Sequence, residues 1–172
     1  MNGLSLVIPT LEHKREAMDY RQEWIDCGEH IHGSASMELH ENYENWLNKT
    51  EQERTSPPPG LVHSTTYFGI CGGRIVGTIQ IRHRLTESLL IRGGHIGYGV
   101  RPSERRKGYA SAMLALALGE CGKLGIEKAL VICDKENTAS AKTIMKNGGV
   151  LENEFTDAAG GVLQRYWIDI VI

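Results

Sequence analysis

The sequence predicts an α/β protein in which one mixed β-sheet carries helices on both of its faces. Residues 94–122 change from the two-residue period of a strand to the spacing of a helix. The continuous apolar run at 128–133 is typical of a central strand that is buried on both faces and parallel to its neighbour. Glycine-containing turns interrupt β-rich segments at 64–83 and 150–172, which predicts two antiparallel hairpins.

Length and composition fit a single ordinary domain that spans residues 1–172. The net charge of −2 argues against general nucleic-acid binding, and no stretch has the apolar length of a membrane span, so we expect neither partner. The cysteines show no metal-ligand spacing, so we expect no metal. Cys121 and Cys133 lie in apolar patterns typical of buried thiols in a reducing compartment, which predicts a cytoplasmic protein.

The first 60 residues predict one strand and two helices. A strand at 4–9 ends at Pro9, and a helix at 12–29 follows it, with Thr10 as the candidate cap. A second helix is expected at about 40–53, because apolar residues recur there at helical spacing. A polar, proline-rich loop then leads to the first hairpin.

The hairpin at 64–83 is expected to turn at Gly72 and Gly73, since a tight turn of this kind needs positive φ angles. A short connector at 84–92 leads to a strand that begins at Gly94. This strand has one face of larger apolar side chains and one face with a histidine and two glycines. The first face consists of Ile96, Tyr98 and Val100, and the second of His95, Gly97 and Gly99.

The second half of the chain predicts two helices, each followed by β-structure. The helices are expected at 108–122 and 138–147, with the buried strand at 128–133 between them. A final hairpin turns at 158–161, and its second strand ends in the apolar run 168–172. We expect that last strand to form an edge of the sheet and, because exposed edges attract further strands, to pair with a second copy in a homodimer.

A basic loop, RRKGYA at 105–110, lies between the strand from Gly94 and the helix that follows. Its backbone N–H groups lie at a helix N-terminus, where the helix dipole favours an anion. Gly108 and Ala110 leave no bulk that would keep a phosphate away. The residue order does not fit a Walker A loop, and the preceding glycines do not fit a Rossmann fingerprint. The loop therefore predicts a phosphate or pyrophosphate site.

The spacing Arg105-x-x-Gly108-x-Ala110 resembles the cofactor motif of the GNAT acetyltransferase superfamily, and the resemblance extends over residues 64–172. The chain also looks like a bacterial branch of predicted acetyltransferases, which implies no particular acceptor. The resemblance implies the GNAT acyl-CoA N-acyltransferase fold, with the loop on the pyrophosphate of acetyl-CoA and the pantetheine arm beside the preceding strand. The cofactor-binding residues that it implies are Tyr98, Gly99, Val100, Arg105, Arg106, Lys107, Gly108, Tyr109, Ala110, Asn137 and Ser140.

The resemblance also implies a general base, and His95 stands where many family members have a glutamate. An imidazole titrates near neutral pH, which suits the removal of a proton from an ammonium group. We expect this side chain to face the acceptor on the same side as Gly97 and Gly99. A structural, hydrogen-bonding role for the histidine stays open. Arg82 and His83 are alternatives, as ligands of a substrate carboxylate or as plain surface charge.

The tyrosine with which many family members protonate the departing thiolate of CoA is absent, because its position is occupied by Ile144. Tyr166 on the last strand is the candidate for this general acid. Alternatively, the thiolate leaves unassisted.

These observations favour an acetyl-CoA-dependent N-acetyltransferase that acts on a primary amine of a small molecule or a protein. The expected partners are acetyl-CoA, an amine acceptor and a second copy of the chain. The alternative is a non-catalytic acyl-CoA-binding module that senses or scaffolds, which the missing tyrosine favours.

Overall fold

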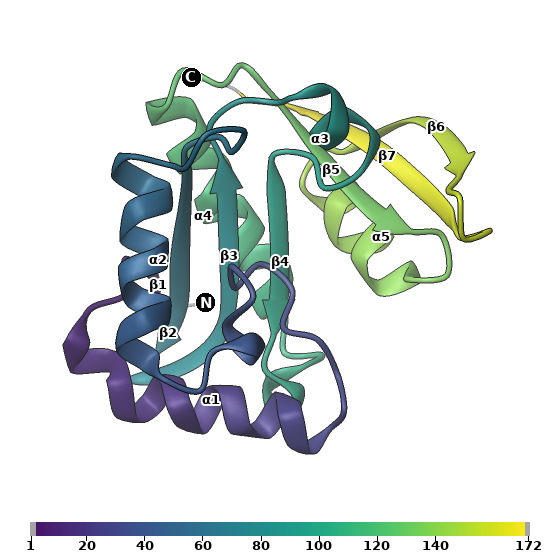
Figure 1. Cartoon of the computed structure of the whole chain (residues 1–172). Coiled ribbons are helices and arrows are strands. Elements are labelled where there is room, and N and C mark those ends of the chain that lie inside the picture. The colour runs from purple at the N-terminus through teal and green to yellow at the C-terminus, as the bar shows by residue number, and fades with distance from the viewer. Residues whose placement is uncertain (1–2, 171–172) are drawn as a thin grey trace.

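The computed structural model describes residues 3–170 and has a seven-stranded mixed sheet with the strand order β1-β2-β3-β4-β5-β7-β6 (Figure 1). Every neighbouring pair is antiparallel except β4 and β5, which are parallel as the sequence predicts. The strands are β1 (Leu4–Val7), β2 (Ser64–Cys71), β3 (Arg74–Arg82), β4 (Ile96–Val100), β5 (Lys128–Asp134), β6 (Val150–Thr156) and β7 (Val162–Asp169).

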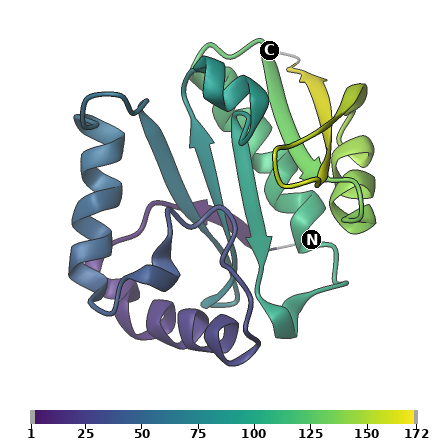
Figure 2. The same cartoon turned by 45° about the vertical axis from the view of Figure 1, so that its right-hand side comes forward.

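Helices cover both faces of this sheet, which confirms the predicted architecture. The first face carries α1 (Lys14–Asp26) and α2 (Tyr43–Thr55), and Figures 1 and 2 show the two helices on the same side. They enclose an aromatic core with β2 and β3 that includes Tyr20, Trp24, Trp46 and Phe68. The second face carries α4 (Tyr109–Lys123) and α5 (Thr138–Lys146), which share an aliphatic core with the central strands. The short helix α3 (Glu87–Ile91) occupies the predicted connector.

β4 and β5 are in register only at the start of β4, and this feature positions the site. Ile96 pairs with Val131, and a single bridge joins Gly94 to the same valine. In the part of the chain that the structure describes, β4 and β5 form no further register pair, and their ribbons diverge toward the end of β4 (Figure 1). The divergence leaves backbone groups of both strands facing a space between them.

The two hairpins form as predicted, but the position of β7 is a correction. Gly72 and Gly73 have φ angles of 57° and 77°, as their turn requires. β7 is not an edge strand, because it pairs with β5 on one side and with β6 on the other. The edges are β1 and β6. The end of the apolar run, Val171 and Ile172, lies outside the described residues, so the reason given for a homodimer does not hold in this form.

No helix within residues 3–170 is long and apolar enough to cross a membrane. Within the same residues, no cluster of three or more His, Cys, Asp or Glu side chains is arranged to hold a metal ion.

Candidate active site

A cleft of about 720 Å³ opens where β4 and β5 diverge. Its walls come from β4, the 105–110 loop, the start of α4, the end of β5 and the first turns of α5. The cleft brings together ten of the eleven residues that the resemblance implies for cofactor binding, and omits Lys107. The ten are Tyr98, Gly99, Val100, Arg105, Arg106, Gly108, Tyr109, Ala110, Asn137 and Ser140.

The N-terminus of α4 is built to receive an anion. Gly108 is its N-cap residue, with a φ of 83°, and no side chain caps the helix. Asn42, Thr86 and Asn137 accept hydrogen bonds at the starts of α2, α3 and α5. Helix α1 also has no side-chain cap, but it continues directly from a 3-10 turn at Leu11–His13. The first N–H groups of a helix have no partner within the helix, and they carry its positive dipole end. In α4 these donors are therefore left for a ligand in the cleft.

Arg105 lies at the mouth of the cleft and is fixed by contacts to the first helix layer. Its Nη1 and Nη2 donate to the two carboxylate oxygens of Glu29 at 2.9 and 2.7 Å. Its guanidinium also lies 5.0 Å from the ring centroid of Trp24. The hydrogen bonds from Arg105 hold the pKa of the Glu29 carboxyl below its usual range. Lys107 points elsewhere, because its ammonium pairs with Glu104 at 2.8 Å.

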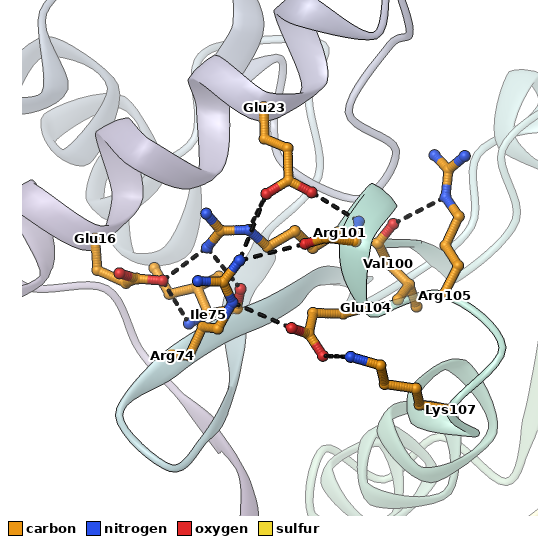
Figure 3. A network of polar contacts seen from close by, with 10 residues as sticks. Glu16, Glu23, Arg74, Ile75, Val100, Arg101, Glu104, Arg105 and Lys107 are labelled. Atoms are coloured by element: carbon orange, nitrogen blue, oxygen red, sulfur yellow. Dashed lines mark hydrogen bonds and ion pairs between the residues drawn. The ribbon is translucent and has the colours of Figure 1, made fainter.

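A buried arginine anchors the start of the same loop (Figure 3). Arg101 is only 4% exposed, and its guanidinium donates to Glu16 at 2.7 Å and to Glu23 at 2.6 Å. The second oxygen of Glu23 accepts the backbone N–H of Ser103 at 2.7 Å, so one carboxylate holds both the arginine and the loop. The sequence did not indicate this network, since its acids lie on α1, far from Arg101 in the chain.

Two polar residues that line the cleft at the start of α5, Asn137 and Ser140, have partners within the protein. Asn137 Oδ1 accepts the N–H of Ser140 at 3.0 Å, so Asn137 caps α5. The Ser140 hydroxyl lies 2.8 Å from the hydroxyl of Tyr98, which reaches across from β4. Burial raises the pKa of Tyr98 to about 12, so its phenol is protonated at any physiological pH.

The structure places His95 beneath the sheet surface and outside the lining of the cleft. The residue is 7% exposed, and its Nδ1 accepts the backbone N–H of Leu130 at 3.0 Å, across the start of the β4–β5 divergence. Burial, with a smaller effect of the nearby Arg82 charge, lowers the pKa of His95 to about 4. An imidazole with that pKa is a weak base at neutral pH. These findings correct the expectation of near-neutral titration and support the structural role that the sequence left open.

The low pKa of His95 predicts an acid-sensitive fold. The unfolded chain binds a proton on this imidazole below pH 6.5, whereas the folded chain binds it only near pH 4. Stability should therefore fall as the pH drops from 6.5 to 4, by up to about 3 kcal/mol for this group. Urea unfolding of the native protein and of His95→Gln at pH 7 and pH 4 measures the difference. Equal losses of unfolding free energy in both proteins would contradict the assignment.

Tyr166 is also outside the cleft lining. It is 3% exposed in the core beneath α4 and α5, and its hydroxyl donates to Gln164 Oε1 at 2.8 Å. Ile144, at the position of the usual family tyrosine, is fully buried in the same core. The structure therefore does not bring the candidate acid Tyr166 to the cofactor residues.

Arg82 lines a second cavity of about 180 Å³, together with Glu53, Gln80 and Thr86. Its Nη1 donates to the carbonyl oxygens of Gly93 and Gly94, both at 3.2 Å. Burial lowers the pKa of Arg82, as expected for a cation that is poorly solvated. His83 lines neither cavity. Its Nε2 lies 2.9 Å from Thr65 Oγ1, and its ring stacks on the ring of His63.

The first helix layer contributes cleft residues that sequence reasoning missed, namely Trp24, Glu29 and His32. The loop after α1 lies directly on β4, since a Cβ on Gly33 would come within 2.2 Å of the Gly97 carbonyl oxygen. A Cβ on Gly99 would lie 2.8 Å from the His32 carbonyl oxygen. Gly33 and Gly99 therefore allow this loop to approach β4, which corrects the expectation of an open face beside Gly97 and Gly99.

An uncapped helix N-terminus that opens into a cleft between diverging parallel strands is suited to a transferase whose donor carries phosphate groups. The family comparison agrees with this class: a family model described as an acetyltransferase (GNAT) domain matches residues 9–150. The chain belongs to the GNAT acetyltransferase family, so the predicted fold class and enzyme class are confirmed. A comparison with curated proteins finds no match.

Several solved acetyltransferases have the same fold. RimL, an α-N-acetyltransferase of ribosomal protein L7/L12 in complex with coenzyme A, is 15% identical, with a TM-score of 0.74 over 99% of this chain and 96% of that chain. The Salmonella typhimurium enzyme that modifies the N-terminal serine of L7/L12 is 16% identical, with a TM-score of 0.70 over 99% and 97%. MccE, in complex with acetyl-CoA and AMP, is 18% identical, with a TM-score of 0.68 over 99% and 94%. At these identities the similarity shows the fold alone.

Proposed function

We propose that the protein transfers the acetyl group of acetyl-CoA to a primary amine of a small molecule or a protein. The observation that carries this proposal is the uncapped N-terminus of α4, with Gly108 in a left-handed conformation, opening into the cleft between β4 and β5. The RimL and MccE structures contain coenzyme A and acetyl-CoA, which supports the same donor here.

The residues of the cleft fit this donor. Main-chain donors of the 108–111 segment would hold the pyrophosphate, as at other helix N-termini that bind phosphate. Arg106, Lys142 and Lys146 line the same cleft and add positive charge near the phosphates. The free backbone groups on β4 can pair with the amides of the pantetheine arm. Once bound, acetyl-CoA supplies an activated thioester, and the chain's part is to hold and orient it.

We place the acceptor at the Arg82 end of the sheet face that His95 shares, next to the cavity that Arg82 lines and away from the loop that covers Gly97 and Gly99. The backbone N–H of Arg82 donates to the carbonyl oxygen of His95 at 2.8 Å, so the two residues lie opposite each other on antiparallel segments. The side chains of opposite residues share a face of the sheet. Arg82 has two carbonyl partners and borders a cavity, so it can bind an acidic group of the acceptor. The sequence-based candidates for the general base and the general acid are His95 and Tyr166. Both side chains are buried, which supports a role in positioning other groups instead of direct proton transfer.

The proposal is tested by calorimetry with acetyl-CoA and by the release of free CoA thiol with a panel of primary amines, with and without a carboxylate. We expect binding and turnover, with preference for the carboxylated amines. Binding without turnover on any amine would favour the non-catalytic acyl-CoA module. The buried Ile144, at the position of the usual family tyrosine, is consistent with that module. Absence of binding would contradict both functions.

We also propose a cytoplasmic location and a homodimer. The Cys121 thiol is fully buried with a pKa raised by burial, and it forms no disulfide, which fits a reducing compartment. The edge strand β6 exposes Val150 and Leu151 by 68% and 44% of their surfaces, and a second copy could cover them. Light scattering that finds a monomer at high protein concentration would contradict the dimer.

A further inference from the structure

We infer that the hydroxyl of Tyr98 donates the hydrogen bond that stabilises the thiolate sulfur of CoA as it leaves the acetyl group. This inference rests on the proposed function, because it assigns one step of that reaction to a residue of the cleft. It gives the missing family tyrosine a replacement from a different element, β4 instead of α5.

The position of Tyr98 carries the first part of the argument. Tyr98 lies two residues beyond the last β4–β5 register pair, and its side chain extends across the divergence to α5. The pyrophosphate loop follows the C-terminal end of β4, so a donor anchored at Gly108 must extend back along β4 to reach the acceptor. That path passes Tyr98, which lines the same cleft.

The hydrogen bonds around Tyr98 carry the second part. Its hydroxyl oxygen lies 2.8 Å from Ser140 Oγ, and either hydroxyl can be the donor. The Tyr98 hydroxyl also donates to the Ser140 carbonyl oxygen, at a long 3.4 Å. When Ser140 Oγ donates to Tyr98, the phenol proton can turn from that carbonyl oxygen to a sulfur in the cleft. A chain of two hydroxyl groups of this kind strengthens the terminal hydrogen bond, because each donor polarises the next.

The protonation state decides between hydrogen bonding and proton transfer. Burial raises the pKa of the Tyr98 phenol to about 12, whereas a thiol ordinarily titrates at about 8.5. The phenol therefore keeps its proton wherever the thiolate exists, and acts as a permanent donor instead of a general acid. A hydrogen bond from such a donor is shorter and stronger when the acceptor is a thiolate than when it is a neutral thioester. It therefore stabilises the sulfur as the carbon–sulfur bond breaks.

The chemical step balances without a proton from Tyr98. The amine nitrogen forms the new bond to the acetyl carbon and the carbon–sulfur bond breaks, with its electron pair passing to sulfur. The nitrogen loses its proton to solvent, and the thiolate, held by the phenol, leaves and takes up a proton from water. The tyrosine is unchanged at the end of the cycle.

The test uses CoA itself and needs no acceptor. The ultraviolet absorbance of the thiolate reports the titration of the bound CoA thiol, after subtraction of the same protein without CoA. We expect this thiol to titrate at least about one pH unit lower in the native protein than in Tyr98→Phe, because a hydrogen bond to the anion is lost. Tyr67→Phe removes a half-buried phenol outside the cleft and should leave the titration unchanged.

A second variant keeps the phenol and protects the test from a folding defect. Incorporation of 3-fluorotyrosine at position 98 makes the donor more acidic, so the bound thiol should titrate lower still. CoA that binds to every variant with the same thiol titration would overturn the inference and leave the proposed function standing. CoA that does not bind to the native protein at all would overturn the proposed function first.

Discussion

Gly108→Asp should lower the affinity for acetyl-CoA by roughly 100-fold or more in a protein that remains folded. Gly108 has a φ of 83° at the N-cap of α4, and aspartate is among the few residues that tolerate such a φ. Aspartate is also a favourable N-cap residue, so its carboxylate would bind the N–H donors that the pyrophosphate needs. The helix would then satisfy itself, and the phosphate would meet a negative charge. Calorimetry measures the loss.

Two further variants separate the causes. Gly108→Asn tolerates the same backbone and caps the helix without a charge, so it should cost less affinity than the aspartate. Gly160→Asp places the same side chain in the loop between β6 and β7, at a φ of 86° and with no atom within 4 Å of the new Cβ. This variant should bind acetyl-CoA with the native affinity. Native affinity in a folded Gly108→Asp protein would mean that the anion does not lie at α4.

Arg101→Ala should destabilise the fold by about 3 kcal/mol or more, because it leaves two partly buried carboxylates without their shared cation. Arg101 is 4% exposed and pairs with Glu16 and Glu23 on α1 (Figure 3). Its loss should also release the loop that Glu23 holds through the Ser103 N–H, so acetyl-CoA affinity should fall as well. Urea unfolding at neutral pH measures the stability.

A surface ion pair provides the matched control. Arg54 pairs with Glu51 at 2.8 Å on the exposed side of α2, where the two side chains are 37% and 52% exposed. Arg54→Ala should change the unfolding free energy by less than about 1 kcal/mol, as usual for exposed pairs. If Arg101→Ala were no more destabilising than this control, the buried network would not hold α1 to the loop.

The sequence predicted the glycine-containing loop and the helix that begins there because their signals are local. A strand, a glycine-containing loop and an amphipathic helix follow one another within residues 94–122, and short-range geometry fixes how they lie. The same holds for Asn137, which caps the helix that it begins. The parallel pairing of β4 and β5 followed from the apolar run of β5.

The remaining site could not be predicted, because it depends on contacts between distant segments. Arg101 finds its carboxylates 78 and 85 residues away, and no spacing in the sequence indicates such a pair. The burial of His95 and Tyr166 could not be predicted for a related reason: strand alternation gives a face, but packing against other elements decides whether that face is reachable. Tyr98 was assigned to cofactor binding alone, since its contact with Ser140 bridges two elements.

The most direct test of the account is a titration of the labelled protein with acetyl-CoA, followed by the backbone amide signals in NMR spectra. The account predicts the largest shifts at the N–H groups of residues 108–111, where α4 has no cap, and small shifts at the capped starts of α2 and α3. Saturable binding that leaves the 108–111 amides unshifted would contradict the central claim that α4 holds the donor's phosphates.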